Sequence, residues 1–165
     1  MKVLILSDSH SYPNFMRQCM DACHPDAVIH LGDFVSDGKD LSRQYPGIPF
    51  YQVPGNCDSG RCDPGMMQTI IINLSGVKLM LTHGHQYFVK ETTGRLLREA
   101  RKARVDAVLY GHTHCMDCHQ EEDGLWVLNP GSAGFFGGSA GWIEIENGKI
   151  LTCRTLRKKD LGAVE

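Results

Sequence analysis

The chain has 165 residues, a length that suits one domain over residues 1–165 and allows a sizeable core. Its 17 basic and 19 acidic side chains nearly cancel, which excludes a strong attraction to nucleic acid or to an anionic membrane through bulk charge. We therefore expect no specific nucleic-acid partner and no membrane partner.

Two features of the chain predict a cytoplasmic protein. The apolar run near the amino terminus, Val3 to Leu6, is too short for a secretory signal, and no later segment is apolar enough to span a bilayer. The seven cysteines are an odd number and cannot all pair within the chain, so free thiols in a reducing compartment are the default.

The first third of the chain has the pattern of an α/β protein. A buried strand is expected over residues 2–7, a helix with one apolar face over 14–23, and a second strand over 26–32. Residues 49–56 predict a third strand that ends in a tight Pro-Gly turn. This order implies parallel pairing with a right-handed crossover.

The rest of the chain predicts hairpins around one further helix. Short apolar segments separated by Gly-containing turns indicate antiparallel strands, and the whole pattern favours an α/β fold in which two β-sheets pack together with helices outside. The expected features are a strand pair joined at Ser75-Gly76, a helix over 92–104, a strand over 106–112, a Gly-rich loop over 131–141, and hairpin turns at Asp123-Gly124 and Asn147-Gly148.

Five short polar blocks follow predicted strands. In open α/β sheets ligands bind at the carboxyl ends of strands, so blocks that are scattered in sequence can converge in space. If the segments are extended, residues two apart point to the same side, and each pair can present two ligands to one place. The blocks are Asp8-Ser-His10, Gly32-Asp33, Gly55-Asn56, His83-Gly-His85 and Gly111-His112-Thr-His114.

The donors in these blocks are carboxylate oxygens, an amide oxygen and imidazole nitrogens. This set suits Mn²⁺, Fe²⁺, Ni²⁺ or Zn²⁺ better than Ca²⁺ or a structural zinc. The number of donors exceeds one tetrahedral site and fits two ions about 3.5–4 Å apart that share a carboxylate. Each block alone also fits a helix cap, a turn or a core histidine. The candidate ligands are Asp8, His10, Asp33, Asn56, His83, His112 and His114.

The ordered set "DSH", "GD", "GNCD", "HGH" and "GHTH" resembles the signature of the calcineurin-like metallophosphoesterases, and in particular their small bacterial and archaeal phosphodiesterases. The resemblance implies a four-layer α/β/β/α fold, with two sheets flanked by helices. It also implies that Asp8, His10, Asp33 and His114 bind one ion, and that Asp33, Asn56, His83 and His112 bind the other. Asp33 would bridge two divalent ions, with Mn²⁺ preferred and Ni²⁺, Zn²⁺, Fe²⁺ or Mg²⁺ as alternatives.

Two departures from the wider family pattern bear on the chemistry. Cys57 follows Asn56 where many relatives have a histidine, and a thiol is a poorer acid than imidazolium. We name His85 as the candidate proton donor, with orientation of His83 as the alternative. The segment 129–141, "NPGSAGFFGGSAG", has no proline or basic residue after Gly131, where relatives commonly close this loop with a proline and a basic residue.

Two other patterns favour competing functions. Cys115-Met-Asp-Cys118-His119 has the spacing of a c-type haem site, but haem attachment occurs outside the cytoplasm, so we interpret the match as accidental. In an extended segment Cys115 and Cys118 would also face opposite sides and could not share a zinc ion. Basic residues of the helix over 92–104 are interpreted as a solvated face.

These observations predict a divalent-metal-dependent phosphodiesterase, in which a metal-bridging hydroxide attacks the phosphorus of a small phosphodiester substrate. The expected catalytic residues are Asp33, Asn56, His85 and Cys57. One alternative is a catalytically weak interaction scaffold, because the scaffold subunit of retromer is similar in fold and size. A phosphomonoesterase or a nucleotide pyrophosphatase is a third reading. A homo-oligomer, either dimer or tetramer, is expected by analogy with relatives.

Overall fold

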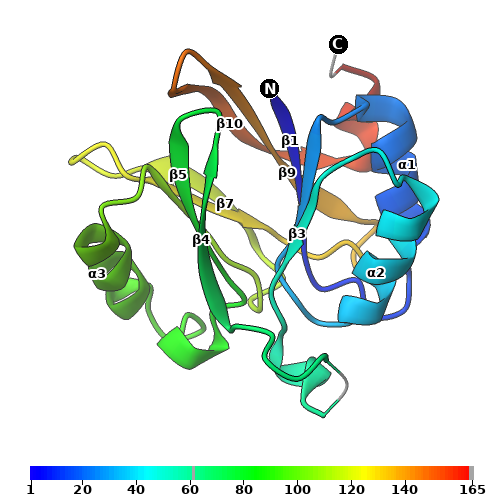
Figure 1. Cartoon of the computed structure of the whole chain (residues 1–165), viewed down its shortest axis with the longest axis horizontal. Helices are drawn as coiled ribbons and strands as arrows, with labels where there is room; N and C mark the ends of the chain where they lie inside the picture. The colour runs from blue at the N-terminus through cyan, green and yellow to red at the C-terminus, as the bar shows by residue number, and fades with distance from the viewer. Residues whose placement is uncertain (61, 164–165) are drawn as a thin grey trace.

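The computed structural model describes residues 1–60 and 62–163. Its strands form two sheets of five strands each, and helices lie on the outer face of each sheet (Figure 1). The strands are β1 (Lys2–Leu6), β2 (Ala27–His30), β3 (Phe50–Gln52), β4 (Thr69–Leu74), β5 (Val77–Thr82), β6 (Ala107–Leu109), β7 (Met116–Gln120), β8 (Trp126–Pro130), β9 (Ser139–Glu146) and β10 (Lys149–Arg157). The helices are α1 (Asn14–Cys23), α2 (Val35–Gln44) and α3 (Gly94–Ala103), with 3₁₀ turns η1 (Asn56–Asp58), η2 (His85–Tyr87) and η3 (Lys158–Ala163).

Both sheets combine parallel and antiparallel pairs. The first sheet has the order β10-β9-β1-β2-β3, in which β1, β2 and β3 are parallel and β9 pairs antiparallel with β1. The second sheet has the order β4-β5-β6-β8-β7, in which β5, β6 and β8 are parallel. The parallel strands of each sheet have their carboxyl ends on the same side, and the polar blocks lie at these carboxyl ends.

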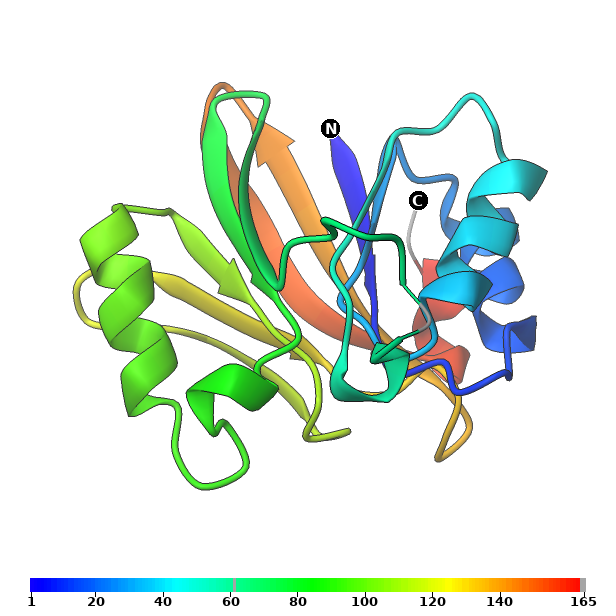
Figure 2. The ribbon, with the colours of Figure 1, turned by 60° about the horizontal axis from the view of Figure 1, so that its bottom comes forward.

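The alternation of side chains along the strands builds three apolar layers. On β1, Val3 and Ile5 point into the core between the two sheets, while Leu4 and Leu6 point toward α1 and α2. On the second sheet, Met80 and Val108 pack instead against α3. Figure 2 shows the resulting α/β/β/α order, with α3 on one side and α1 and α2 on the other. The predicted fold class is therefore confirmed.

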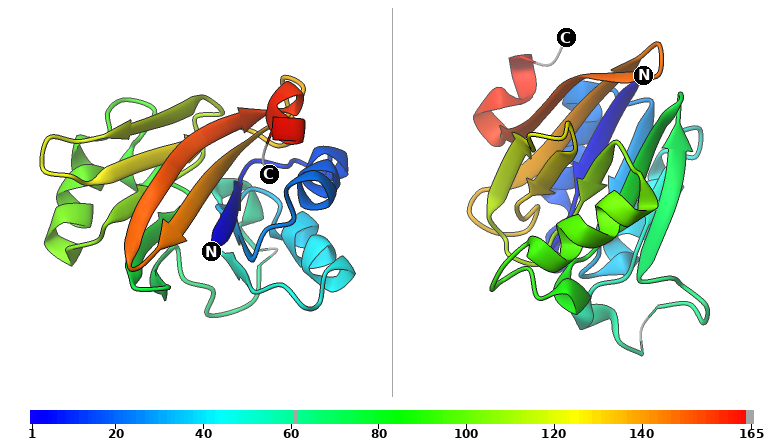
Figure 3. Two further views of the ribbon diagram at one scale, coloured as in Figure 1. Left: turned by 90° about the horizontal axis from the view of Figure 1, so that it is seen from above. Right: turned by 90° about the vertical axis from the view of Figure 1, so that its left-hand side faces the viewer.

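The hairpin of β9 and β10 closes one side of the sandwich. Its two-residue turn places Asn147 and Gly148 at φ of 51° and 73°, the left-handed region that such turns require. Strand β10 forms the edge of the first sheet and contacts β7 and β8 of the second (Figure 3). The hairpin thus connects the two sheets. It also places Arg157, at the end of β10, and η3 near the carboxyl ends of the strands that carry the polar blocks.

The strands expected over 49–56 and 106–112 are shorter than predicted, and two further elements differ from the sequence-based expectations. Helix α2 was not predicted, because its segment VSDGKDLSRQ is largely polar and buries only Val35, Gly38 and Leu41. A parallel crossover between β2 and β3 nevertheless needs a connection of about a dozen residues, which is usually helical. The Gly-rich loop is also shorter than expected, because residues 139–141 begin β9. Among the described residues, no helix has the length and apolar character to cross a membrane.

Candidate metal centre

Turns at the carboxyl ends of five strands carry the candidate ligands. Asp8 follows β1, Asp33 follows β2 and Asn56 lies beyond β3, while His83 follows β5 and His112 and His114 lie beyond β6. Main-chain hydrogen bonds join these turns: the Asp8 amide donates to the Gly32 carbonyl at 2.9 Å, and the Gly111 amide donates to the His83 carbonyl at 3.0 Å.

Four of the candidate ligands form one tight cluster. Ligand atoms of Asp8, His10, Asp33 and His114 all lie within 4.8 Å of one another. His114 Nε2 is 3.1 Å from Asp8 Oδ1 and 3.3 Å from His10 Nε2. His10 Nε2 in turn lies 3.7 Å from Asp33 Oδ2. Two carboxylates and two imidazoles that face a common point are a donor set for a divalent ion such as Mn²⁺ or Zn²⁺.

The backbone geometry that brings these ligands together is not the extended one that the sequence suggested. Asp8, His10, His112 and His114 have φ of 54°, 46°, 70° and 58°, so each lies in the left-handed region. The interpretation of each pair as neighbours on one face of a strand is therefore wrong. The chain turns sharply after each strand instead, and this strain places the side chains over the sheet edge.

A second group of donors also lies next to Asp33. His83 Nε2 is 3.1 Å from Asn56 Oδ1 and 3.5 Å from Asp33 Oδ2. The His112 ring centroid is 5.1 Å from that of His83. Asp33 Oδ2 thus faces both His10 and His83, the position expected for a carboxylate shared between two ions.

The hydrogen bonds of the donors leave their inner atoms available for a cation. His83 Nδ1 lies 2.8 Å from the Leu31 carbonyl, which only accepts, so Nδ1 carries a proton and Nε2 is the ring atom that can bind a cation. Asp33 Oδ1 accepts from the Cys57 amide at 2.9 Å. Asp8 Oδ2 accepts from the Ser7 hydroxyl, whereas its buried Oδ1 has no hydrogen-bond partner among the described residues. The residues present therefore fit divalent metal ions.

The charges of the cluster favour a bound cation as well. Burial alone would raise the pKa of Asp8 and of Asp33, but contacts with His114 and His83 outweigh it and hold both pKa values below their usual range. Burial lowers the pKa of His83, but Asp33 and Asp8 raise it further than burial lowers it. Two ionised carboxylates that draw a proton onto a buried imidazole would draw a divalent cation by the same attraction.

Close backbone contact explains the glycines of the polar blocks. A Cβ atom on Gly55 would lie 2.1 Å from Asp33 Oδ1, and one on Gly111 would lie 2.1 Å from the Ser7 hydroxyl oxygen. Both distances are far inside van der Waals contact, so a side chain at either position would displace a carboxylate.

Cys57 and His85 border the cluster. Burial, with Asp33 adding to it, raises the pKa of the Cys57 thiol to about 11, so the thiol is protonated at neutral pH. The His85 ring lies 5.4 Å from that of His83, and burial lowers the pKa of His85. A neutral His85 is a weaker proton donor than imidazolium, which favours its alternative role of orienting His83 or a water molecule.

Sequence reasoning missed Asp58, although it lies in the "GNCD" block. Its buried carboxylate accepts from the amides of Phe34 and Val35 at 2.9 Å and from the amide of Gly55 at 2.8 Å. Asp58 therefore ties the turn after Asp33 to the turn that carries Asn56. The available signal was an acidic residue two positions after the candidate ligand Asn56.

The CxxCH segment contributes no shared metal site in the described part of the chain. Cys115 is exposed, while Cys118 on β7 turns toward β10, where its Sγ atom lies 3.4 Å from that of Cys153. His119 points elsewhere and pairs with Asp117 and Glu121. The two cysteines of the motif thus have separate surroundings.

The chain is similar to several known proteins. Residues 1–147 match the family described as "Calcineurin-like phosphoesterase superfamily domain". A probable metallophosphoesterase of Mycoplasma pneumoniae is 32% identical over 134 residues, which cover 79% of this chain and 78% of that protein. A phosphodiesterase of Methanocaldococcus jannaschii is 28% identical, over 79% of this chain and 83% of that protein. The solved structure of Vps29 from Entamoeba histolytica complexed with Zn²⁺ has a TM-score of 0.71 at 22% identity, over 94% of this chain and 98% of that one, a likeness of fold alone.

Proposed function

This chain belongs to the calcineurin-like phosphoesterase superfamily, and on that premise we propose that it is a divalent-metal-dependent phosphodiesterase acting on a small phosphodiester. The observation that carries the proposal is the position of Asp33. Its Oδ2 atom lies 3.7 Å from His10 Nε2 and 3.5 Å from His83 Nε2, so it can be shared by two ions. The similarity to a protein named as a phosphodiesterase supports the diester as the substrate class.

Two divalent ions, Mn²⁺ preferred, would supply a hydroxide nucleophile that bridges them and positive charge to neutralise the developing phosphorane. Asp8, His10 and His114 would hold one of the ions, Asn56, His83 and His112 the other, and Asp33 both. The Leu31 carbonyl fixes the His83 tautomer, and the Cys57 amide fixes the Asp33 rotamer.

Cys57 and His85, the candidate proton donors for the leaving group, are both weak acids in this structure. Cys57 stands beside the cluster with its proton retained, and His85 favours the neutral form. We therefore propose that turnover is fastest with substrates whose leaving group needs little protonation, such as a phenolate.

Two alternatives remain for the same fold. A catalytically weak interaction scaffold is supported by the fold shared with Vps29. The complete donor set favours the enzyme, because a scaffold under no catalytic demand can lose metal-binding residues. A phosphomonoesterase or nucleotide pyrophosphatase would use the same ions on a different ester. The cytoplasmic location and the homo-oligomeric state stay predictions.

The decisive experiment is metal reconstitution. Protein stripped with a chelator is refilled with Mn²⁺, Ni²⁺, Zn²⁺, Fe²⁺ or Mg²⁺, the bound ions are counted by elemental analysis, and hydrolysis of bis(p-nitrophenyl) phosphate is followed beside p-nitrophenyl phosphate. We expect two ions per chain and metal-restored cleavage of the diester with little cleavage of the monoester. Inactivity on both esters with two ions bound would overturn the proposal in favour of the scaffold. Faster cleavage of the monoester would favour the phosphomonoesterase.

A further inference from the structure

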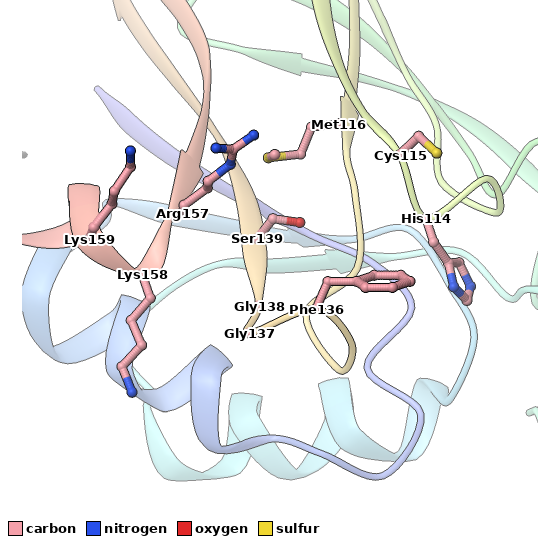
Figure 4. A pocket seen from close by; sticks show the side chains of 10 residues that line it. All are labelled: His114, Cys115, Met116, Phe136, Gly137, Gly138, Ser139, Arg157, Lys158 and Lys159. Atoms are coloured by element: carbon pink, nitrogen blue, oxygen red, sulfur yellow. The ribbon is translucent and has the colours of Figure 1, made fainter.

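A cavity of about 670 Å³ opens directly beside the candidate metal centre. His114 belongs to both, and the other walls come from the end of the Gly-rich loop, the start of β7, the end of β10 and the start of η3 (Figure 4). Its volume lies within the range of about 300–1,000 Å³ that is typical of small-molecule sites. The lining residues are His114, Cys115, Met116, Phe136, Gly137, Gly138, Ser139, Arg157, Lys158 and Lys159.

The charged residues of this cavity are all cationic. Arg157, Lys158 and Lys159 line it, and among the described residues no acidic side chain is one of its walls. The nearest acidic residue in sequence, Asp160, uses its Oδ2 atom to accept the Arg157 amide at 2.8 Å. Figure 4 shows Lys158 and Lys159 at the opposite end from His114, with the Arg157 guanidinium directed toward Met116. An anion at that end would be stabilised by charge-assisted hydrogen bonds.

An aromatic surface lies between the cations and the metal centre. Phe136 is 92% exposed although it is large and apolar, and in Figure 4 its ring is turned toward His114. The neighbouring Phe135 ring stacks on the His114 ring, with centroids 5.5 Å apart and an interplanar angle of 18°. A ring left in solvent beside a cationic cavity gains stability when a planar group covers it.

We propose that this cavity binds the part of the substrate beyond the scissile phosphate, and that the substrate is a nucleotide-like phosphodiester with a second phosphate. The proposal rests on the proposed phosphodiesterase activity. The scissile phosphate would lie at the metal centre, the base against Phe136, and the second phosphate on Arg157. Lys158 points to the other side in Figure 4, but its exposed side chain is free to turn toward that phosphate. Hydrolysis adds one water across a P–O ester bond, which gives a phosphomonoester and an alcohol that takes the remaining proton.

A matched pair of chromogenic esters tests the second phosphate. Thymidine 5′-(p-nitrophenyl phosphate) and its 3′-phosphorylated counterpart share the base, the scissile bond and the leaving group, and differ only in one added phosphate. We expect the 3′-phosphate to raise kcat/KM by roughly tenfold, the effect of one to two charge-assisted hydrogen bonds. Equal kcat/KM values for the two esters would overturn the proposal.

Variants of the cavity test where the added phosphate is recognised. The double variant Arg157→Gln/Lys158→Gln should lower the preference for the phosphorylated ester to near unity. The matched control is Lys102→Gln, which removes an exposed cation that pairs with Glu99 on α3 and does not line the cavity, and it should keep the full preference. Phe136→Leu should raise KM for both thymidine esters by roughly fivefold, because it removes base stacking. A double variant that keeps the preference would show that the phosphate binds elsewhere.

A binding measurement separates failure of this inference from failure of the proposed function. Isothermal titration with thymidine 3′,5′-bisphosphate should show roughly tenfold tighter binding than with thymidine 5′-monophosphate, and the double variant should lose the difference. If no ester is cleaved but this difference is found, the cavity stands and the phosphodiesterase proposal falls. If the esters are cleaved and the two nucleotides bind equally, the phosphodiesterase stands and the cavity proposal falls.

Discussion

His114 Nε2 lies 3.1 Å from Asp8 Oδ1, although the two residues come from different sheets of the sandwich. The same Asp8 oxygen is buried, and in the described part of the chain none of its contacts, the one with His114 included, has hydrogen-bond geometry. A buried carboxylate oxygen without a donor is costly unless a cation completes its surroundings. This contact is therefore the clearest sign in the structure that the two sheets meet around an ion.

Replacement of the shared carboxylate tests the centre most directly. Asp33→Asn keeps the shape of the side chain but removes the charge that two ions would share, so turnover of bis(p-nitrophenyl) phosphate should fall by roughly a hundredfold or more. Elemental analysis should show that both ions are held more weakly. The exposed Asp40, which pairs with Arg43, provides the control Asp40→Asn. An Asp33→Asn protein with nearly wild-type turnover would exclude the bridging role.

Removal of the Asp58 carboxylate should affect both stability and activity. Asp58→Ala leaves three buried or half-buried amides without their acceptor, those of Phe34, Val35 and Gly55. We expect a loss of roughly 2–4 kcal/mol in the free energy of unfolding, measured by urea denaturation, and weaker metal binding.

The control for Asp58 is Asp63→Ala, which removes an exposed partner of Lys39 and should cost less than about 1 kcal/mol. Equal stability of the two variants would show that Asp58 does not hold the two turns together.

The fully buried His30 should make the protein acid-sensitive. Burial lowers the pKa of His30 from 6.5 to about 4, despite the opposing charges of Asp8 and Asp58. Between these two pH values the unfolded chain binds a proton at His30 that the folded chain does not. His30 therefore leaves the free energy of unfolding unchanged above pH 6.5 and lowers it as the pH falls from 6.5 toward 4. The shift corresponds to roughly 3 kcal/mol.

The measurement is the free energy of unfolding from pH 7 to pH 4 for the wild type and for His30→Gln. The amide does not titrate, so the variant should show a shallower fall over this range. The lowered pKa values of His85 and His112 act in both proteins and cancel in the comparison. Parallel curves would show that His30 keeps its ordinary pKa in the folded state.

A change at Cys57 should widen the range of leaving groups. Cys57→His places an imidazole beside the Asp33 carboxylate, where the present thiol has a pKa raised to about 11 by burial. We expect cleavage of a dinucleotide with an alkoxide leaving group to rise by at least roughly tenfold, because general acid catalysis contributes most to poor leaving groups. Hydrolysis of bis(p-nitrophenyl) phosphate should change much less. An equal effect on both substrates would argue against a missing acid at this position.

Much of the fold could be predicted because local patterns and the structure agree. Helix α1 follows the apolar periodicity of residues 14–23, and the turns at Ser75-Gly76 and Asn147-Gly148 have the left-handed φ values that such sequences favour. Helix α2 could not be found in this way, because only Val35, Gly38 and Leu41 of its ten residues are buried. Its helical state follows from the crossover between β2 and β3 rather than from its own composition.

The sequence by itself determined the donors of the candidate centre, because the residue types and their places after predicted strands depend only on local order. Only the tertiary structure decided how they meet. The contact between Asp8 and His114, the Asp58 contacts that join two turns, and the cavity between the Gly-rich loop and Arg157 all connect residues distant in the chain. Such contacts depend on how two sheets pack, and a periodic pattern along one segment carries no information about that packing.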